Sequence, residues 1–271
     1  MKFIIEPEVF EDDIENLTSC LKQKGITYHF VKQDSIYVYL KNYPNKCFCY
    51  GSLEFIRKIK ELNNPNLITS CTIENYDYRI YSKHFAAYSR IEFLFNHNPQ
   101  TVKANNIKDF LDTPHFLRPA VGYKPNGFTG GVYDLKDLEY IQGCFNRNDE
   151  ILVCGKRHID NEYRIIVSNN QYVTGCRYKT FCKETNKLGF DPDSLVPNHV
   201  LGYIEFYLKN LYWYPDDIYV MDLAEVDTIC DVTCRPSKKI QLLEINALST
   251  SGFYDCDCNK IVDEIIKIYE K

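Results

Sequence analysis

The sequence predicts a mixed α+β (α/β) fold, and three observations support this prediction. The chain begins with an apolar run at residues 2–5, a helical apolar spacing at residues 11–24 and a second apolar run at residues 26–31, which together are typical of a βαβ unit. Beyond residue 100, short apolar runs outnumber helical patterns. With 271 residues, of which 45% are hydrophobic and 14% aromatic, the chain can bury one large or two modest cores.

The first hundred residues are expected to form a small α/β lobe of their own. Ile14, Leu17 and Leu21 repeat at helical spacing in residues 11–24. Residues 35–40 and 46–50 are rich in β-branched and aromatic side chains and are expected to be strands, and Ser52 is expected to cap a helix that continues to about residue 62. The polar, turn-rich stretch 96–106 (NHNPQTVKANN) divides a domain at residues 1–100 from one at residues 101–271.

The second domain is expected to be α+β, with neither an internal repeat nor a low-complexity segment. Its expected helices are residues 198–210 and 259–270. Its expected strands are residues 116–119, 151–155, 163–167, 171–176, 218–224 and 240–246.

The composition indicates a soluble cytoplasmic protein. Its 32 basic and 37 acidic residues give a net charge of −5, which is not the basic surface of a general nucleic-acid binder. The N-terminus becomes acidic before an apolar run long enough for a signal peptide, and no later stretch is long enough for a membrane helix. The 12 cysteines are expected to be reduced. Three close pairs lack CxxC spacing, so buried thiols are favoured over zinc ligands: Cys47 and Cys49, Cys230 and Cys234, Cys256 and Cys258.

A glycine-rich stretch at residues 116–132 (FLRPAVGYKPNGFTGGV) is a candidate phosphate-binding loop. Arg118 and Lys124 carry positive charge, and the glycines allow backbone N–H groups to approach an anion. A glycine-rich surface hairpin is the alternative explanation. No GxxxxGK[ST], no GxGxxG after a strand and no protein-kinase signature occurs, so Walker, Rossmann and kinase sites are not supported.

Three oxygen-bearing side chains stand in apolar strands near the C-terminus. Glu244 and Asn246 alternate in the LLEIN run and therefore share one face, while Asp222 interrupts IYVMDLAEV. Because polar groups on apolar strands are unfavourable unless something satisfies them, the three predict a Mg²⁺ site. A carboxylate paired with a basic residue is the alternative for Asp222.

Two further strands carry candidate nucleotide contacts. Glu162 and Arg164 share a strand face in DNEYRIIV, where a salt-bridged surface pair is the alternative. The run ILVCGK at residues 151–156, with Val153 and Lys156, is an apolar strand that opens into a Gly-Lys turn and could contact an adenine edge. An ordinary buried strand is the alternative there.

Taken in order, these segments resemble the ATP-grasp superfamily, and most closely its R2K clade, in which an arginine stands where most members have the first phosphate-binding lysine. Arg118 takes that position in RPAVGYKPNGFTGG, ILVCGK is similar to the hinge strand, and Glu162 and Arg164 are similar to the E-x-R strand. The tail NALSTSGFYD is similar to that of D-alanine ligase and glutathione synthetase relatives. Leu248 departs from the substrate-binding arginine that some carboxylases and ligases place after the metal ligands.

The resemblance implies two α+β lobes that clasp ATP, preceded by the small N-terminal lobe, and it implies a ligase. A carboxylate would be phosphorylated by ATP to an acylphosphate and attacked by an amine, with release of ADP and phosphate. Arg118 and Arg164 would be the catalytic residues. The metal ligands would be Asp222, Glu244 and Asn246, and the nucleotide contacts Arg118, Lys124, Val153, Lys156, Glu162 and Arg164.

The acceptor is left open by the resemblance, which allows amino acids, small metabolites or a protein or peptide. Arg177 in VTGCRY is the candidate contact for the substrate carboxylate, with an ordinary surface arginine as the alternative. A nucleotide-binding module without ligase activity is the competing functional hypothesis. A nucleic-acid ligase that forms a lysyl adenylate is disfavoured because no KxDG motif occurs.

Overall fold

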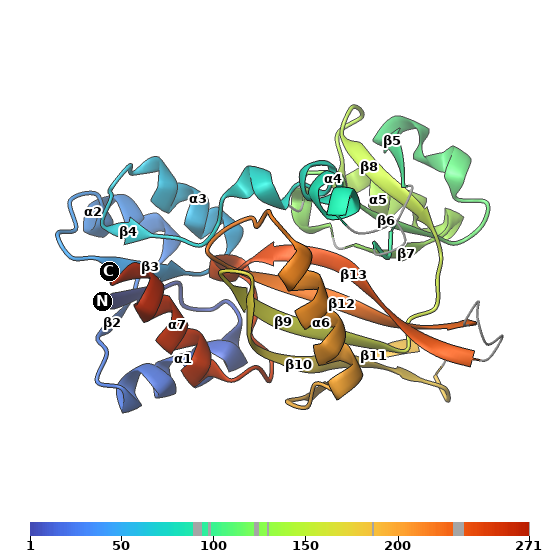
Figure 1. Ribbon diagram of the computed structural model, residues 1–271. Helices are drawn as coiled ribbons and strands as arrows, with labels where there is room; N and C mark the ends of the chain where they lie inside the picture. The colour runs from blue at the N-terminus through green and yellow to red at the C-terminus, as the bar shows by residue number, and fades with distance from the viewer. Residues whose placement is uncertain are drawn as a thin grey trace. The chain divides into compact units, whose positions relative to one another are not determined.

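The computed structural model describes residues 1–88, 94–96, 99–121, 125–128, 130–185, 187–229 and 236–270. These residues form a mixed α/β structure with three sheets, in agreement with the predicted fold class (Figure 1). The α-helices are α1 (Glu11–Gln23), α2 (Ile36–Leu40), α3 (Leu53–Glu61), α4 (Tyr78–Tyr88), α5 (Leu138–Cys144), α6 (Asn198–Asn210) and α7 (Cys258–Tyr269). Within the described ranges, no helix is both long enough and apolar enough to cross a lipid bilayer.

The chain divides into two compact units that are not contiguous in sequence. The first unit contains Met1–Thr72, Asn161–Leu223 and Glu244–Lys271, and the second contains Ile73–Asp160 and Ala224–Leu243. Residues 73–100 therefore fall with the residues that follow them. The division into an N-terminal lobe at residues 1–100 and a second domain at residues 101–271 stays a prediction.

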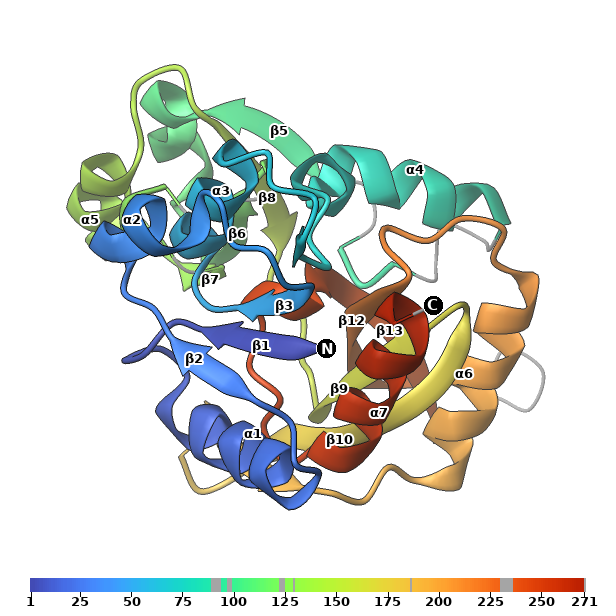
Figure 2. The same cartoon turned by 90° about the vertical axis from the view of Figure 1, so that its left-hand side faces the viewer.

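The N-terminal sheet of the first unit has the strand order β2-β1-β3-β4, and its strands pair in parallel. Burial on both faces explains why the central strands β1 and β3 are continuous apolar runs rather than alternating ones. Helices α1 and α7 lie side by side in the two views of Figures 1 and 2 and contribute Leu17 and Ile265 to the core around this sheet. The strands are β1 (Lys2–Ile5), β2 (Tyr28–Phe30), β3 (Cys47–Tyr50) and β4 (Leu67–Ile68).

One predicted strand is wrong. Residues 35–40 are helical instead: Ser35 ends a short 3₁₀ helix at Gln33–Ser35, and Ile36–Leu40 form helix α2. Ile36 and Leu40 are buried, whereas Val38 is 81% exposed, and burial at positions i and i+4 is the pattern of a helix packed on one side. The β-branched and aromatic residues between them face solvent and do not decide the local structure.

The second unit contains its own four-stranded sheet with the order β5-β8-β6-β7 and the apolar core of Leu117, Phe128, Ile141 and Ile151. Its strands pair antiparallel. Strand β5 lies inside the polar stretch that was expected to be a linker. The strands are β5 (Gln100–Lys103), β6 (His115–Pro119), β7 (Gly131–Tyr133) and β8 (Glu150–Gly155).

The third sheet has the strand order β11-β10-β9-β12-β13. The described chain forms β9 (Asn161–Ser168), β10 (Gln171–Cys182), β11 (Lys187–Asp193), β12 (Ile218–Ile229) and β13 (Pro236–Ala247). Strand β10 continues six residues past the predicted end at residue 176 and pairs with both β9 and β11. Strand β9 carries Glu162 and Arg164, β12 carries Asp222, and β13 carries Glu244 and Asn246.

Candidate functional site

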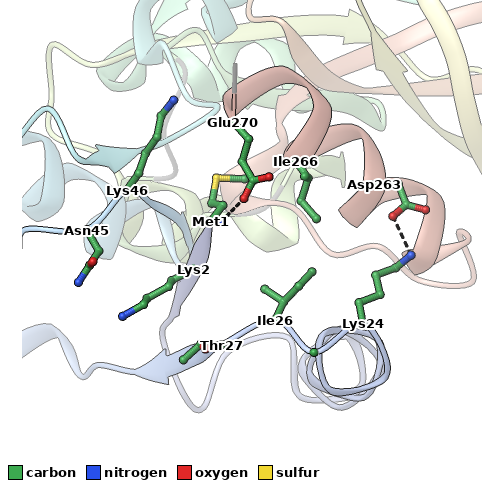
Figure 3. Close-up of a pocket in the computed structure, with 11 residues that line it drawn as sticks. Met1, Lys2, Lys24, Ile26, Thr27, Asn45, Lys46, Asp263, Ile266 and Glu270 are labelled. Atoms are coloured by element: carbon green, nitrogen blue, oxygen red, sulfur yellow. Dashed lines mark hydrogen bonds and ion pairs between the residues drawn. The ribbon is translucent and has the colours of Figure 1, made fainter.

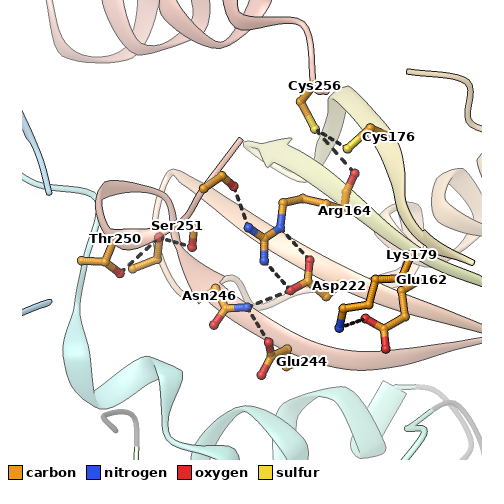
Figure 4. Close-up of polar contacts among 12 residues, drawn as sticks. Glu162, Arg164, Cys176, Lys179, Asp222, Glu244, Asn246, Thr250, Ser251 and Cys256 are labelled. Carbon is orange, nitrogen blue, oxygen red and sulfur yellow. Dashed lines mark hydrogen bonds and ion pairs between the residues drawn. The ribbon is translucent and has the colours of Figure 1, made fainter. Parts of the chain in front are cut away.

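Arg164 is the centre of a buried polar cluster in the first unit. Its Nε donates to Asp222 Oδ1 at 2.9 Å and its Nη2 to Asp222 Oδ2 at 2.8 Å, which forms a bidentate ion pair between β9 and β12 (Figure 4). The Arg164 side chain is 7% exposed and that of Asp222 is 0% exposed. Two charges so far from water require this complete pairing, because breaking it would leave one of them buried alone.

Each charge of the pair shifts the pKa of the other group, and both shifts favour the charged forms. Burial raises the pKa of the Asp222 carboxyl, and the Arg164 charge and its hydrogen bonds oppose that rise. Burial lowers the pKa of Arg164, but the Asp222 charge outweighs burial and the pKa lies well above its ordinary value. Arg164 is therefore a fixed positive charge at this point of the sheet.

A short segment after β13, residues 252–256, surrounds the other side of Arg164. The Gly252 carbonyl accepts a hydrogen bond from Arg164 Nη1 at 2.6 Å, and the ring of Tyr254 lies 4.3 Å from the guanidinium carbon. Tyr254 stacks in turn on Tyr178 of β10 with ring centroids 5.0 Å apart. These contacts fix the guanidinium plane and extend the polar cluster to an aromatic pair.

The same segment is anchored to helix α1 by a buried carboxylate. Asp13 Oδ1 accepts a hydrogen bond from the Tyr254 backbone N–H at 2.8 Å. A Cβ atom at Gly252 would lie 2.7 Å from Asp13 Oδ2, so a side chain at this position would displace the Asp13 carboxylate. Burial raises the pKa of Asp13, and backbone hydrogen bonds from Tyr254 and Phe253 oppose the rise.

Glu244 and Asn246 meet the ion pair from the neighbouring strand β13. Asn246 Nδ2 donates to Asp222 Oδ2 and to Glu244 Oε1, each at 3.1 Å, so the amide joins the two carboxylates (Figure 4). The predicted common face of Glu244 and Asn246 is observed. The three predicted metal ligands Asp222, Glu244 and Asn246 are thus brought together by neighbouring strands.

Glu162 and Lys179 form a second ion pair close to the first. Lys179 Nζ lies 2.8 Å from Glu162 Oε2, the Glu162 side chain is buried, and the two residues are register partners on β9 and β10. The sequence analysis missed Lys179 because it ended the strand at residue 176. The register between β9 and β10 shifts between Arg177 and Lys179, so simple alternation along β10 would not have placed Lys179 beside Glu162.

Arg177 lies in a different environment. It is the register partner of Tyr163, whereas Cys176 is the partner of Arg164, so Arg177 projects from the face of the sheet opposite to Arg164. Its Nη2 lies 3.2 Å from Asp191 and 3.5 Å from Asp193, both on β11. A substrate contact for Arg177 stays a prediction beside this structural explanation.

The remaining predicted contacts belong to the second unit or lie outside the described residues. Arg118 on β6 donates from Nη1 to the Tyr81 hydroxyl at 3.2 Å, and its guanidinium carbon lies 5.8 Å from the Tyr78 ring centre. Val153 is buried in β8, and Lys156 is exposed just after that strand. Lys124 lies outside the described residues.

A cavity of about 730 Å³ lies elsewhere in the first unit (Figure 3). Its lining includes Lys2, Thr27 and Lys46, at or just before the first residues of the parallel strands β1, β2 and β3, together with the ion pair of Lys24 and Asp263 at 2.7 Å. None of the predicted site residues lines it. Ligands of open α/β sheets bind outside the carboxyl ends of the strands, so this cavity is not the candidate site.

The described cysteines carry free thiols. Cys47 and Cys49 are buried in β3, as predicted for core thiols. In the part of the chain that the structure describes, no group of three or more His, Cys, Asp or Glu side chains is arranged to hold a metal. The candidate Mg²⁺ site contains only two carboxylates and depends on the Asn246 amide as its third ligand. Cys230 and Cys234 lie outside the described residues.

No protein-family model matches the sequence. No curated protein matches it either. Solved structures do match over nearly the whole chain, although with low sequence identity. The D-cycloserine synthetase DcsG superposes with a TM-score of 0.63 at 11% identity, covering 98% of this chain and 99% of that chain.

Two further solved structures give the same result. D-alanine–D-alanine ligase from Bacillus anthracis superposes with a TM-score of 0.58 at 13% identity, covering 98% of this chain and 96% of that chain. The ATP-grasp ligase PsnB has a TM-score of 0.54 at 11% identity, with 98% of both chains covered. The chain therefore has the ATP-grasp fold, which confirms the predicted fold class.

Proposed function

We propose that this protein is an ATP-dependent carboxylate–amine ligase of the ATP-grasp kind, and of its R2K clade. The observation that carries the proposal is the cluster formed by the buried Arg164–Asp222 pair with the half-buried Glu244 and Asn246 on adjacent strands of an ATP-grasp fold. A fixed cation next to three oxygen-bearing side chains suits a magnesium–triphosphate ligand. Neighbours with this fold include a D-alanine–D-alanine ligase complexed with ATP and PsnB complexed with Mg and ADP.

The residues present fit a hard divalent cation. Asn246 Nδ2 lies 3.1 Å from one oxygen of Asp222 and 3.1 Å from one oxygen of Glu244. A positively polarised N–H group therefore already occupies the point between the two carboxylates, where their negative potentials add. In the proposal the Asn246 amide turns so that its oxygen, rather than Nδ2, faces the two carboxylates, and the three groups then supply the oxygen ligands that Mg²⁺ takes. In the proposal these three residues hold Mg²⁺, which when bound neutralises charge on the phosphate oxygens.

The other residues of the chain bind and orient the reactants. Arg164 offers its charge from a position fixed by Asp222, Gly252 and Tyr254, so little side-chain freedom remains to be lost on binding. Lys179 keeps the buried Glu162 carboxylate in place. Arg118, with Lys124, Val153 and Lys156, supplies the remaining nucleotide contacts, and these residues together with Glu162 and Arg164 make up the proposed nucleotide-binding set.

The proposed reaction phosphorylates a substrate carboxylate to an acylphosphate, which an amine then attacks to form a C–N bond with release of ADP and phosphate. The neighbours suggest two substrate classes. PsnB is complexed with a precursor peptide and AMPPNP, and the macrocyclase MdnC is bound with the precursor peptide MdnA. D-alanine–D-alanine ligase and D-cycloserine synthetase are named for small amino-acid-like products. Either class presents a carboxylate and an amine.

Thermal unfolding with and without Mg-ATP tests nucleotide binding. A ligand that binds only the folded state stabilises it by mass action, by about 2.7 kcal/mol at a concentration one hundred times its dissociation constant, so Mg-ATP should raise the melting temperature by several degrees. Mg²⁺ alone and Mg-AMP are the controls. An unchanged melting temperature and no heat of binding at millimolar Mg-ATP would contradict the proposal.

Mass spectrometry of cell extract treated with the purified protein then identifies the acceptor. The expected result is a mass gain in one extract component that requires ATP and equals a second component minus water. Its absence from a parallel treatment without ATP is the control.

A nucleotide-binding module without ligase activity is the alternative, and one observation favours it. Both Asp222 oxygens already accept hydrogen bonds from Arg164, so metal binding must use their remaining lone pairs. Release of ADP that depends on an acceptor would identify a ligase. Binding of Mg-ATP without acceptor-dependent ADP release would identify the module.

A further inference from the structure

Two buried thiols lie directly behind Arg164. Cys176 on β10 is the register partner of Arg164, and Cys256 ends the segment of residues 252–256 that surrounds the Arg164 side chain. The two sulfur atoms lie 3.5 Å apart, and Cys256 Sγ also lies 3.8 Å from the Arg164 carbonyl oxygen (Figure 4). Both thiols are unbridged.

We propose that Cys176 and Cys256 form a reversible disulfide with hydrogen peroxide as the oxidant, and that this disulfide switches the site by moving the segment that holds Arg164. The first half concerns only the thiols. The second half, a change in turnover, rests on the proposed ligase function.

The chemistry balances with one equivalent of peroxide. The Cys176 thiolate attacks one peroxide oxygen, the O–O bond breaks, and the departing hydroxide takes the thiol proton to leave as water. The resulting sulfenic acid is attacked by the Cys256 sulfur, which forms the S–S bond and expels the second oxygen as water with the Cys256 proton. Two thiols and one peroxide thus give one disulfide and two waters.

The environment of the pair favours this direction of attack. Cys256 donates its S–H to Cys176, and this hydrogen bond lowers the pKa of Cys176 despite its burial. Cys256 is 7% exposed and Cys176 0% exposed, so an oxidant close to water in size enters on the side of Cys256 and reaches the Cys176 sulfur, which lies 3.5 Å from that of Cys256.

A second pair of thiols, Cys20 and Cys258, lies nearby but is less suited. Cys20 Sγ is already engaged with Asn259 Oδ1 at 3.1 Å, and burial raises the pKa of Cys20. Burial and the neighbouring Cys20 raise the pKa of Cys258 to about 12. Both thiols therefore resist the deprotonation that oxidation requires.

Closing the bond changes the geometry around Arg164. An S–S bond is about 2.05 Å long, so the sulfurs must approach by roughly 1.5 Å from their present 3.5 Å. Strand β10 is held on both sides by β9 and β11, so we expect the segment 252–256 to move instead. That segment carries the Gly252 carbonyl and the Tyr254 ring, which fix the guanidinium of Arg164.

The test starts from fully reduced wild-type protein treated with hydrogen peroxide, followed by thiol blocking, digestion and mass spectrometry. We expect a loss of two hydrogens and one cross-linked peptide pair containing Cys176 and Cys256, reversed by dithiothreitol. Acceptor-dependent ATP turnover should fall at least tenfold and recover on reduction. Cys176→Ser and Cys256→Ser should keep their turnover after peroxide, whereas the matched control Cys258→Ser should respond like the wild type.

A readout independent of catalysis separates this inference from the ligase proposal. Movement of residues 252–256 should change the near-ultraviolet circular dichroism of the Tyr178–Tyr254 stack in the oxidised wild type and leave the Cys176→Ser spectrum unchanged. A cross-link between Cys20 and Cys258, or sulfinic acid without a cross-link, would overturn the site. A mapped Cys176–Cys256 disulfide with an unchanged spectrum would overturn the switch. If the reduced protein has no turnover, the ligase proposal fails and the mapping and spectrum still decide the inference.

Discussion

Two pairs of neighbouring strands in the five-stranded sheet carry charges in opposite settings. Between the central strands β9 and β12, Arg164 and Asp222 are almost fully buried and joined by two hydrogen bonds. Between β10 and the edge strand β11, the Arg177 side chain is 28% exposed, and that of Asp191, 3.2 Å away, is 62% exposed. Arg164 and Arg177 both lie in strands with alternating side chains, yet only Arg164 is buried.

The difference matters because the surroundings determine how much a charge pair contributes. An exposed pair typically contributes between 0 and about 1 kcal/mol, since water and salt screen it. Removing one partner of a buried pair costs about 3–5 kcal/mol, because the other charge stays buried and uncompensated. The buried pair of Arg164 and Asp222 makes the fold sensitive to the loss of either partner. A function for the Arg164 charge explains why the pair lies in the central strands.

Asp222→Asn should therefore be the most damaging change to stability. It leaves the Arg164 charge buried without its carboxylate, and the free energy of unfolding should fall by about 3–5 kcal/mol in urea denaturation. Arg177→Gln is the matched control in the exposed pairing of β10 with β11 and should change the free energy of unfolding by less than about 1 kcal/mol. Equal losses for the two variants would remove the distinction between the buried and the exposed charge pair.

Glu244→Gln and Asn246→Ala should affect turnover far more than stability. Glu244 is only half buried, and a glutamine can still accept the hydrogen bond from Asn246, so the fold should survive. Turnover of ATP should drop by roughly a hundredfold or more, the scale of losing one electrostatic stabiliser. The double variant should lose much less than the product of the two losses, because residues that act as a unit are not additive.

Asp191→Asn removes a charge from the edge strand β11 of the same sheet and is the control for these kinetics. It should leave turnover within about twofold, because Asp191 is a surface partner of Arg177. If the Glu244 and Asn246 variants instead melt earlier and keep their turnover per folded molecule, the pair is structural and the metal assignment is wrong.

Much of the fold could be predicted because local patterns and packing agree. The spacing of Ile14, Leu17 and Leu21 is that of the observed helix α1, and all three are buried. Residues 35–40 fail because their β-forming side chains lie on the exposed surface of α2, where tertiary burial of Ile36 and Leu40 decides the structure. Sequence composition does not show which residues of a short apolar run will be covered.

The site could be predicted in its parts but not in its pairings. Asp222 and Arg164 were both singled out, yet their ion pair joins residues 58 positions apart and depends on β9 and β12 becoming neighbours. The alternative of a carboxylate paired with a basic residue is what the structure contains, together with the contact from Asn246. The roles of Gly252, Tyr254 and Asp13 depend on three-dimensional contacts that no local pattern encodes.

The smallest predicted effect is a pH dependence of stability from Asp13, whose carboxylate anchors the segment around Arg164. The Asp13 carboxyl has an ordinary pKa of 3.8, which applies to the unfolded state, and burial raises its pKa in the folded state. Between the unfolded-state and the folded-state pKa, the folded protein therefore binds more protons than the unfolded protein. Lowering the pH through the folded pKa should therefore stabilise wild type relative to Asp13→Asn, and raising it should remove that gain. The change is about 1.4 kcal/mol for each unit of pKa shift, measured as the difference between the two proteins in urea denaturation at pH 7 and at pH 4. An opposite slope, with wild type losing stability relative to Asp13→Asn on acidification, would mean that the backbone hydrogen bonds to Asp13 outweigh its burial and that the ionised carboxylate is the preferred anchor of residues 252–256.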